Sequence, residues 1–132
     1  MDQRQILLGI LKNHDKTMFK EFLAFCSRPN VAVDESVRFL ESLIYVKRRL
    51  PRQDLSAHSQ GIYSTFTKDG AYWEVNLPAG IKSGIKQFVD SGLEPDFGAA
   101  QEEIISTLVN NNIVRSFIEY KRSGQVRRDR RD

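Results

Sequence analysis

Several residue types that carry chemistry are scarce in this chain. It has one cysteine, two histidines and one tryptophan among 132 residues. Cys26 has no second cysteine for a disulfide within the chain and lies beside Phe25 on an apolar face, so we interpret it as a core residue. His14 and His58 lie in different segments, without a cysteine or second histidine at the spacing of zinc ligands. The sequence therefore predicts neither a disulfide framework nor a metal site.

Long apolar runs and nucleotide-binding motifs are also missing. No run approaches the roughly 20 apolar residues that a membrane-spanning helix needs. The opening segment has an early acidic residue, a glycine and no small-residue cleavage site, which argues against a secretory signal. The patterns GxxxxGK(S/T), GxGxxG and GxSxG do not occur, so a phosphate-binding loop and a nucleophile elbow lack their residues. We expect a cytoplasmic protein with no cofactor and no active site of its own.

The net charge of +3 comes from the C-terminal end. Residues 121–132 contain six Lys or Arg and two Asp, whereas the preceding 120 residues contain 14 basic and 15 acidic residues. The body has no basic stripe of the kind that follows a nucleic-acid backbone, so no nucleic-acid partner is expected. We predict residues 122–132 to be a disordered tail or the start of a linker. The alternative is contact with an acidic membrane surface, which would bring the protein to the inner face of the plasma membrane.

Apolar residues recur at helical spacing through most of the chain. In residues 97–120 they are three and four apart on both sides of three consecutive asparagines, which predicts two amphipathic helices meeting at a polar corner. Such a pair needs the rest of the chain to complete its core. At this length we expect one all-α domain over residues 1–121. Its predicted core contains Phe19, Phe22, Phe39, Leu40, Ile62, Phe66, Phe97, Ile104 and Phe117.

Helix start and stop signals divide the segment before residue 51. The spacing predicts a helix over residues 3–13 and a second helix, capped by Asp15, that ends near residue 26. A third helix is expected to start at Asp34 as its N-cap and to run to Leu50, where Pro51 stops it.

Two further helices and a loop are predicted between residues 54 and 96. One helix covers about residues 54–66, and another starts at Pro78 and carries Phe88 on its apolar face. Asp69-Gly70 is a turn signal. Residues 71–78, AYWEVNLP, are predicted to be a loop because no second strong strand is present to pair with them. Asp96 is the expected cap of the helix that follows.

Five sequence blocks resemble the regulator of G-protein signalling (RGS) domain family, as in a divergent member. They are FKEFL at residues 19–23, DESVRFL at 34–40, IYSTF at 62–66, EVNLP at 74–78 and FGAAQEEI at 97–104. Their order and spacing match over about residues 4–120. The resemblance implies an RGS-like fold of about nine helices, with a four-helix bundle from the middle of the chain and a smaller subdomain that joins its ends.

The resemblance also implies a function and a contact surface. Such domains bind the switch regions of a heterotrimeric G-protein α subunit in its GTP or transition-state form and accelerate GTP hydrolysis. Asn76 occupies the position whose asparagine in the family reaches into the switch regions beside the catalytic glutamine. The alternative is that Asn76 caps the next helix. The positions that match the family's contact surface are Glu35, Ser36, Asn76, Leu108, Asn112, Arg115 and Ser116.

Three of these positions depart from the pattern of active members. Ser36 stands where many have asparagine, Asn112 where they have aspartate, and Ser116 near an expected arginine, with only Arg115 adjacent. Similar substitutions occur in the axin-like and receptor-kinase-like branches. A second hypothesis is therefore a non-activating interaction module of the same fold. A third, a helical domain with an unrelated role, requires the block matches to be coincidental.

Overall fold

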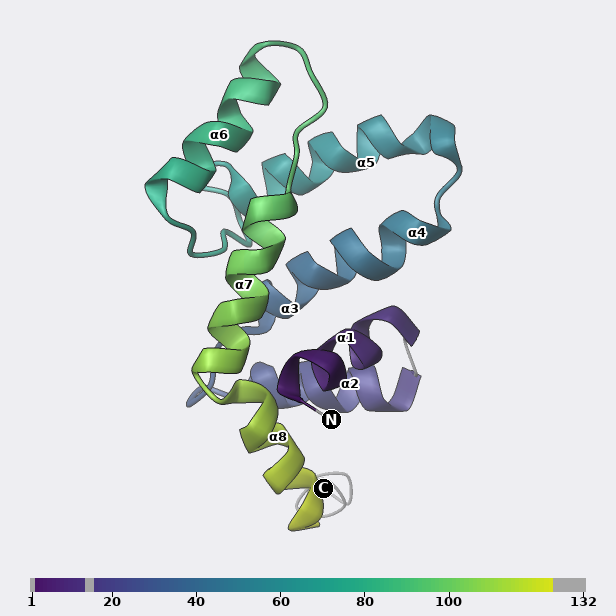
Figure 1. The fold of residues 1–132 in the computed structure, drawn as a ribbon, viewed down its shortest axis with the longest axis vertical. Coiled ribbons are helices and arrows are strands. Elements are labelled where there is room, and N and C mark those ends of the chain that lie inside the picture. The colour runs from purple at the N-terminus through teal and green to yellow at the C-terminus, as the bar shows by residue number, and fades with distance from the viewer. Residues whose placement is uncertain (1, 14–15, 125–132) are drawn as a thin grey trace.

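The computed structural model describes residues 2–13 and 16–124, and the regular elements in this part of the chain are all helical (Figure 1). They are α1 (Gln3–Asn13), α2 (Lys16–Cys26), α3 (Asp34–Glu41), η1 (Ser42–Val46), α4 (Lys47–Arg49), η2 (Arg52–Asp54), α5 (Leu55–Ile62), η3 (Tyr63–Thr67), α6 (Ala79–Asp90), α7 (Gly98–Asn110) and α8 (Ile113–Arg122). Because α3, η1 and α4 are consecutive, as are η2, α5 and η3, the described residues form seven helices. The resemblance implied about nine.

Most helix ends lie where the sequence places them. The first helix has the predicted bounds, and the third ends just before Leu50, whose extended backbone is the conformation that a following proline imposes. The prediction that Asp34 is the N-cap of the third helix is wrong. Asp34 is the first helical residue rather than the N-cap, since Val33 holds that position and no side chain caps the helix. The predicted cap Asp15 lies outside the described residues.

The turn and the loop before α6 also follow the prediction. The Ala71 amide donates to the Lys68 carbonyl at 3.0 Å, and Gly70 has a φ of 80°, which favours glycine. Residues 71–78 contain no strand. Just before α7, the Asp96 carboxylate accepts a hydrogen bond from the Gly98 amide at 2.9 Å. Phe97 and not Asp96 holds the N-cap position of α7, so the prediction of Asp96 as the cap is corrected.

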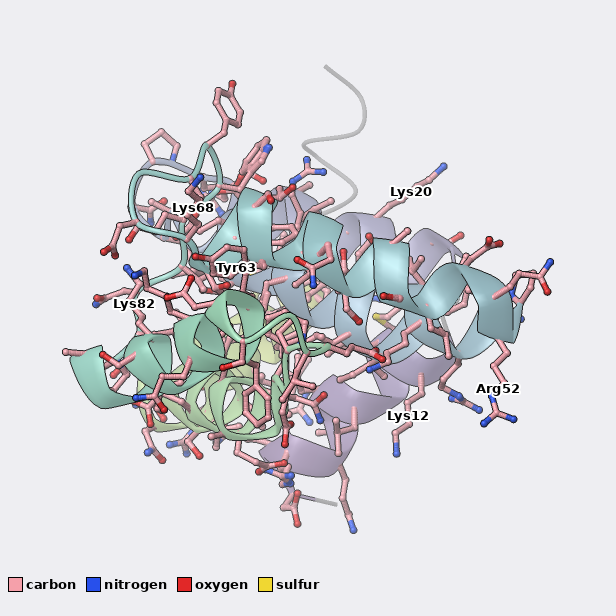
Figure 2. The ribbon with its side chains drawn as sticks, turned by 90° about the horizontal axis from the view of Figure 1, so that it is seen from above. Lys12, Lys20, Arg52, Tyr63, Lys68 and Lys82 are labelled. Carbon is pink, nitrogen blue, oxygen red and sulfur yellow. The ribbon has the colours of Figure 1, made fainter. Side chains whose placement is uncertain are left out.

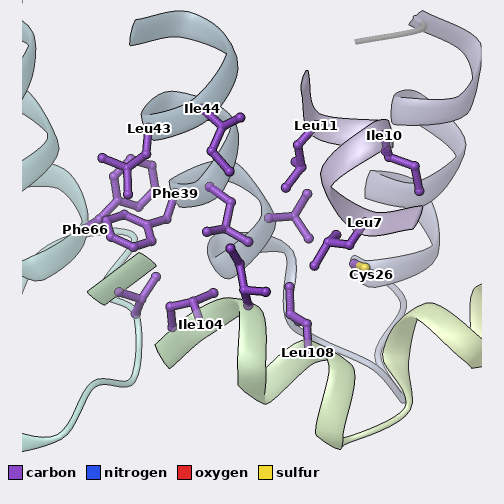
Figure 3. Packing of buried hydrophobic residues seen from close by; sticks show 14 of the residues in the cluster. Leu7, Ile10, Leu11, Cys26, Phe39, Leu43, Ile44, Phe66, Ile104 and Leu108 are labelled. Atoms are coloured by element: carbon purple, nitrogen blue, oxygen red, sulfur yellow. The ribbon is translucent and has the colours of Figure 1, made fainter. Parts of the chain in front are cut away.

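The core contains every residue predicted to be there. Each of the nine is at most 7% exposed, and Figure 3 shows several of them packed between the helices. The ring centroid of Phe39 lies 5.6 Å from that of Phe66 and 6.2 Å from that of Phe97, so one aromatic cluster joins α3, η3 and the start of α7. The sequence places Phe88 on the apolar face of its helix, but its side chain is 39% exposed, so this expectation is corrected.

The first two helices and the last helix lie together, below the helices of the middle part of the chain in Figure 1. Helix α1 contacts α2, α7 and α8, and α2 contacts α8. A salt bridge of 3.0 Å joins Lys121 on α8 to Glu21 on α2, and another of 2.9 Å joins Arg4 on α1 to Glu102 on α7. The middle helices pack as α3 on α7 and as α6 on both α7 and η3. This arrangement leaves the connections between helices at the surface.

Two expectations concern the chain's surroundings. Among the described residues, none of the helices is long and apolar enough to cross a membrane. The prediction for the basic tail falls mostly on residues 125–132, which lie outside the described residues.

Candidate functional site

Three connections between helices lie on one side of the molecule in Figure 1. They are the α2–α3 connection, the η3–α6 loop and the α7–α8 corner. Asn76 and Asn112 lie within these connections, and four more predicted contact residues lie in the first turns of the helices that follow: Glu35, Ser36, Arg115 and Ser116. Helix α3 and the η3–α6 loop are in direct contact, because the Arg38 guanidinium on α3 lies 4.9 Å from the centre of the Trp73 ring in the loop. Helix α3 also packs on α7. These contacts make the side a candidate for binding a partner.

The backbone of the η3–α6 loop turns Asn76 outward. The Val75 amide donates to the Phe66 carbonyl at 2.8 Å, and Val75 and Leu77 are both buried. Asn76 between them is exposed. The alternative role for Asn76, a cap for α6, is wrong, because Pro78 holds the N-cap position and no side chain bonds there. The Asn76 carboxamide can therefore both donate and accept toward a partner.

Lys82 on α6 fastens the same loop electrostatically. Its ammonium contacts the Asp69 carboxylate at 2.9 Å and also pairs with Glu74, whose other oxygen accepts a hydrogen bond from the Gly70 amide at 3.1 Å. Hydrogen bonding to Lys82 lowers the pKa of both carboxyls, and bonding to Glu74 and then Asp69 raises the pKa of Lys82. One lysine on α6 thus holds two carboxylates of the segment that leads to Asn76.

A cleft of about 260 Å³ lies between η3 and α6, and Figure 2 shows Tyr63, Lys68 and Lys82 from its lining. Lys82 is already paired with two carboxylates, and Lys86, also in the lining, lies 3.2 Å from Asp90. Since these charges are largely neutralised within the chain, the cleft does not have the strong positive potential of an anion site.

Acidification is expected to break the ion pairs of Lys82 with Asp69 and Glu74 only well below neutral pH. The pKa values of Asp69 and Glu74 are lower in the folded chain than the unfolded values of about 4, so the ion pairs stabilise the loop above pH 4. That contribution is lost as the pH falls through the lowered values. In an NMR titration, Lys82→Met should move both carboxyl midpoints up toward about 4. The control Lys86→Met should leave the titration midpoint of Glu74 in place. Unchanged midpoints of Asp69 and Glu74 in Lys82→Met would contradict the pairing of these carboxylates with Lys82.

The predicted contact residues of α3 lie in its first turn. Glu35 and Ser36 are both half-buried, and the Ser36 amide donates to the Val33 carbonyl at 3.1 Å.

Burial, reinforced by the negative charges of Asp34 and Glu35, raises the pKa of the Cys26 thiol to about 12. At neutral pH Cys26 is therefore not a nucleophile, in agreement with its interpretation as a core residue.

The α7–α8 corner turns at Asn112. This residue has a φ of 59°, in the left-handed region that asparagine tolerates better than most residues, and its carbonyl accepts a hydrogen bond from the Ser116 amide at 2.9 Å. Arg115 and Ser116 are exposed on the first turn of α8. The contact of Arg115 with Glu119 is long, at 3.9 Å, and exposed, so it restrains Arg115 little.

Leu108 does not lie where the contact surface requires. It is 1% exposed and packs in the core beside Ile104 (Figure 3), so the placement of its side chain on the surface is corrected. The reason is that α7 turns this position toward α1 and α3, which both pack on α7. Leu108 therefore belongs to the core beneath the candidate contact surface.

An aromatic pair in the loop was not among the predicted site residues. Tyr72 is 88% exposed, and its ring lies edge-on to that of Trp73 with centroids 5.3 Å apart. The available signal was two adjacent aromatic residues in a loop, three and four positions before Asn76.

The described residues contain no group of three or more His, Cys, Asp or Glu side chains that could hold a metal ion. Comparison with known protein families gives a match over most of the chain. The sequence model of the Regulator of G protein signaling domain matches residues 8–123, which includes every connection described above. No curated protein matches the chain.

Proposed function

Because the chain belongs to the regulator of G protein signaling family, we propose that it binds the switch regions of a heterotrimeric G-protein α subunit and accelerates GTP hydrolysis there. Domains of this family stimulate the GTPase of their partner and are not enzymes themselves. The observation that carries the proposal is Asn76, exposed on a loop that backbone hydrogen bonds join to η3 and an ion pair joins to α6.

The proposed mechanism asks only for positioning. GTP hydrolysis depends on orienting the attacking water and stabilising charge, and an α subunit carries its own arginine for the second task. A partner that favours the transition-state arrangement of the switch loops lowers the barrier without supplying a base. The carboxamide of Asn76 suits this role, because it can bond a donor and an acceptor at once. Glu35 and Ser36 on α3, with Asn112, Arg115 and Ser116 at the corner, complete the proposed surface.

Short side chains favour a second candidate, an interaction module that binds without activating. Ser36 and Ser116 reach less far than an asparagine or an arginine, and Asn112 lacks a charge. The loss of charge assistance at one hydrogen bond is worth about 1 kcal/mol. The buried Leu108 adds no contact of its own.

Binding to α subunits in different nucleotide states should separate the two candidates. We expect the chain to bind tighter to α subunits loaded with GDP and aluminium fluoride, which mimic the transition state, than to the same subunits with GDP alone. Surface-immobilised chain and a panel of purified α subunits provide the measurement. Equal affinity in the two states would favour the interaction module. Absence of binding across the panel would overturn both candidates.

A further inference from the structure

The loop that carries Asn76 also carries the large apolar side chain with the greatest exposure in the described part of the chain. Tyr72 is 88% exposed, against 55% for Leu93 and 39% for Phe88. A single exposed aromatic side chain on a protein surface requires no explanation by itself. The way in which Tyr72 is supported is what sets it apart.

Three side chains form a stack that leads from α3 to the tip of the loop. The Arg38 guanidinium lies 4.9 Å from the centre of the Trp73 ring, and the Trp73 ring meets that of Tyr72 at 76° with centroids 5.3 Å apart. The Arg38 Nε atom is buried and has no hydrogen-bond partner among the described residues. The guanidinium therefore contacts the ring face in a cation–π arrangement. Trp73 is in turn packed on the core.

The backbone restrains the same tip. The Glu74 amide donates to the Ala71 carbonyl at 3.2 Å, which closes a four-residue turn with Tyr72 and Trp73 at its centre. The Trp73 amide donates to the Thr65 carbonyl at 3.1 Å and so holds the turn on η3. An aromatic side chain on a restrained turn loses little conformational entropy when a partner covers it.

Tyr72 lies close enough to Asn76 to share its partner. Four residues of extended chain span at most about 14 Å. A standard interface buries roughly 800 Å² on each partner, which is a patch wider than that distance. A partner whose interface is of ordinary size and is centred near Asn76 therefore reaches Tyr72 as well.

We propose that Tyr72 is a binding anchor for the same α subunit that Asn76 contacts, positioned by Trp73 and Arg38. The proposal rests on the function proposed above and identifies where much of the binding energy comes from. Buried tyrosines are among the residues that dominate interface energetics. A phenol ring fits an apolar hollow that has a hydrogen-bond acceptor at its rim, and we assign that chemistry to the facing surface of the α subunit. Such an anchor offsets the limited reach of Ser36 and Ser116.

The test compares affinities for an α subunit loaded with GDP and aluminium fluoride. Tyr72→Ala should weaken binding roughly tenfold to hundredfold, mostly through faster dissociation. Tyr72→Phe should stay within about threefold, since it keeps the ring. Leu93→Ala removes an exposed apolar side chain from the α6–α7 connection and should bind like the wild type. Thermal melts of all three variants should match the wild type, because neither side chain is buried.

Each other result overturns the inference in a distinguishable way. If the wild type binds and Asn76→Ala weakens it while Tyr72→Ala does not, the anchor is wrong and the proposed function stands. If Leu93→Ala weakens binding as much as Tyr72→Ala, the effect is one of general surface apolarity and the anchor is again wrong. If the wild type binds no α subunit in either nucleotide state, both the anchor and the proposed function fall.

Discussion

Phe97→Ala is expected to remove about 3 to 5 kcal/mol of stability, the usual cost of emptying a buried phenylalanine site. Phe97 is 5% exposed and lies edge-on to Phe39, with ring centroids 6.2 Å apart. It also occupies the N-cap position of α7, so the cavity opens where that helix meets α3. A domain of this size has only about 5 to 15 kcal/mol in total, so much of the fold's margin disappears.

Thermal and urea unfolding measure this loss directly. The melting temperature should fall by roughly 10 to 20 °C for a domain of this length. Phe88→Ala provides the matched control, since it removes the same side chain from a site that is 39% exposed and should cost clearly less. Equal losses of stability in the two variants, or an unchanged melting temperature in Phe97→Ala, would show that the buried Phe97 ring does not stabilise the core as described.

Asn76→Ala is expected to reduce stimulated GTP hydrolysis roughly tenfold to hundredfold, which corresponds to about 1 to 3 kcal/mol for the lost hydrogen bonds. These bonds form chiefly in the transition state in the proposed mechanism, so turnover should fall more than the affinity for the GDP state. Stability should not change, because Asn76 is exposed and does not cap α6. Single-turnover hydrolysis beside thermal melts gives both quantities.

Two further variants make the test of Asn76 specific. Gln87→Ala removes another exposed carboxamide, from helix α6, which follows the loop, and should leave stimulation unchanged. Asn76→Asp keeps the size and an acceptor but loses the donor, and should fall between wild type and alanine. Wild-type binding without stimulation of any α subunit would instead favour the interaction module. Full stimulation in Asn76→Ala would remove Asn76 from the mechanism.

The sequence by itself was enough for the features that depend on neighbours along the chain. Helical spacing of apolar residues predicted the bounds of α1 and the burial of Phe39 and Phe66, because the period of 3.6 places such residues on one face. The turn at Gly70 was predicted because glycine adopts positive φ at low cost. The family followed from five short blocks in order, and its sequence model matches residues 8–123.

Tertiary structure decided what depends on residues distant in sequence. Helical spacing places Leu108 on the apolar face of its helix, where it is buried, and only the family resemblance placed it on the contact surface. Spacing could not tell that Phe88 stays partly exposed, or that Arg38 meets Trp73 across 35 positions of chain. An apolar stripe covers a wide arc of a helix, and only the packing of other helices determines which of its members are covered. The supported position of Tyr72 has the same origin. Its stack exists because the η3–α6 loop folds back onto α3, and no local pattern in the sequence specifies that contact.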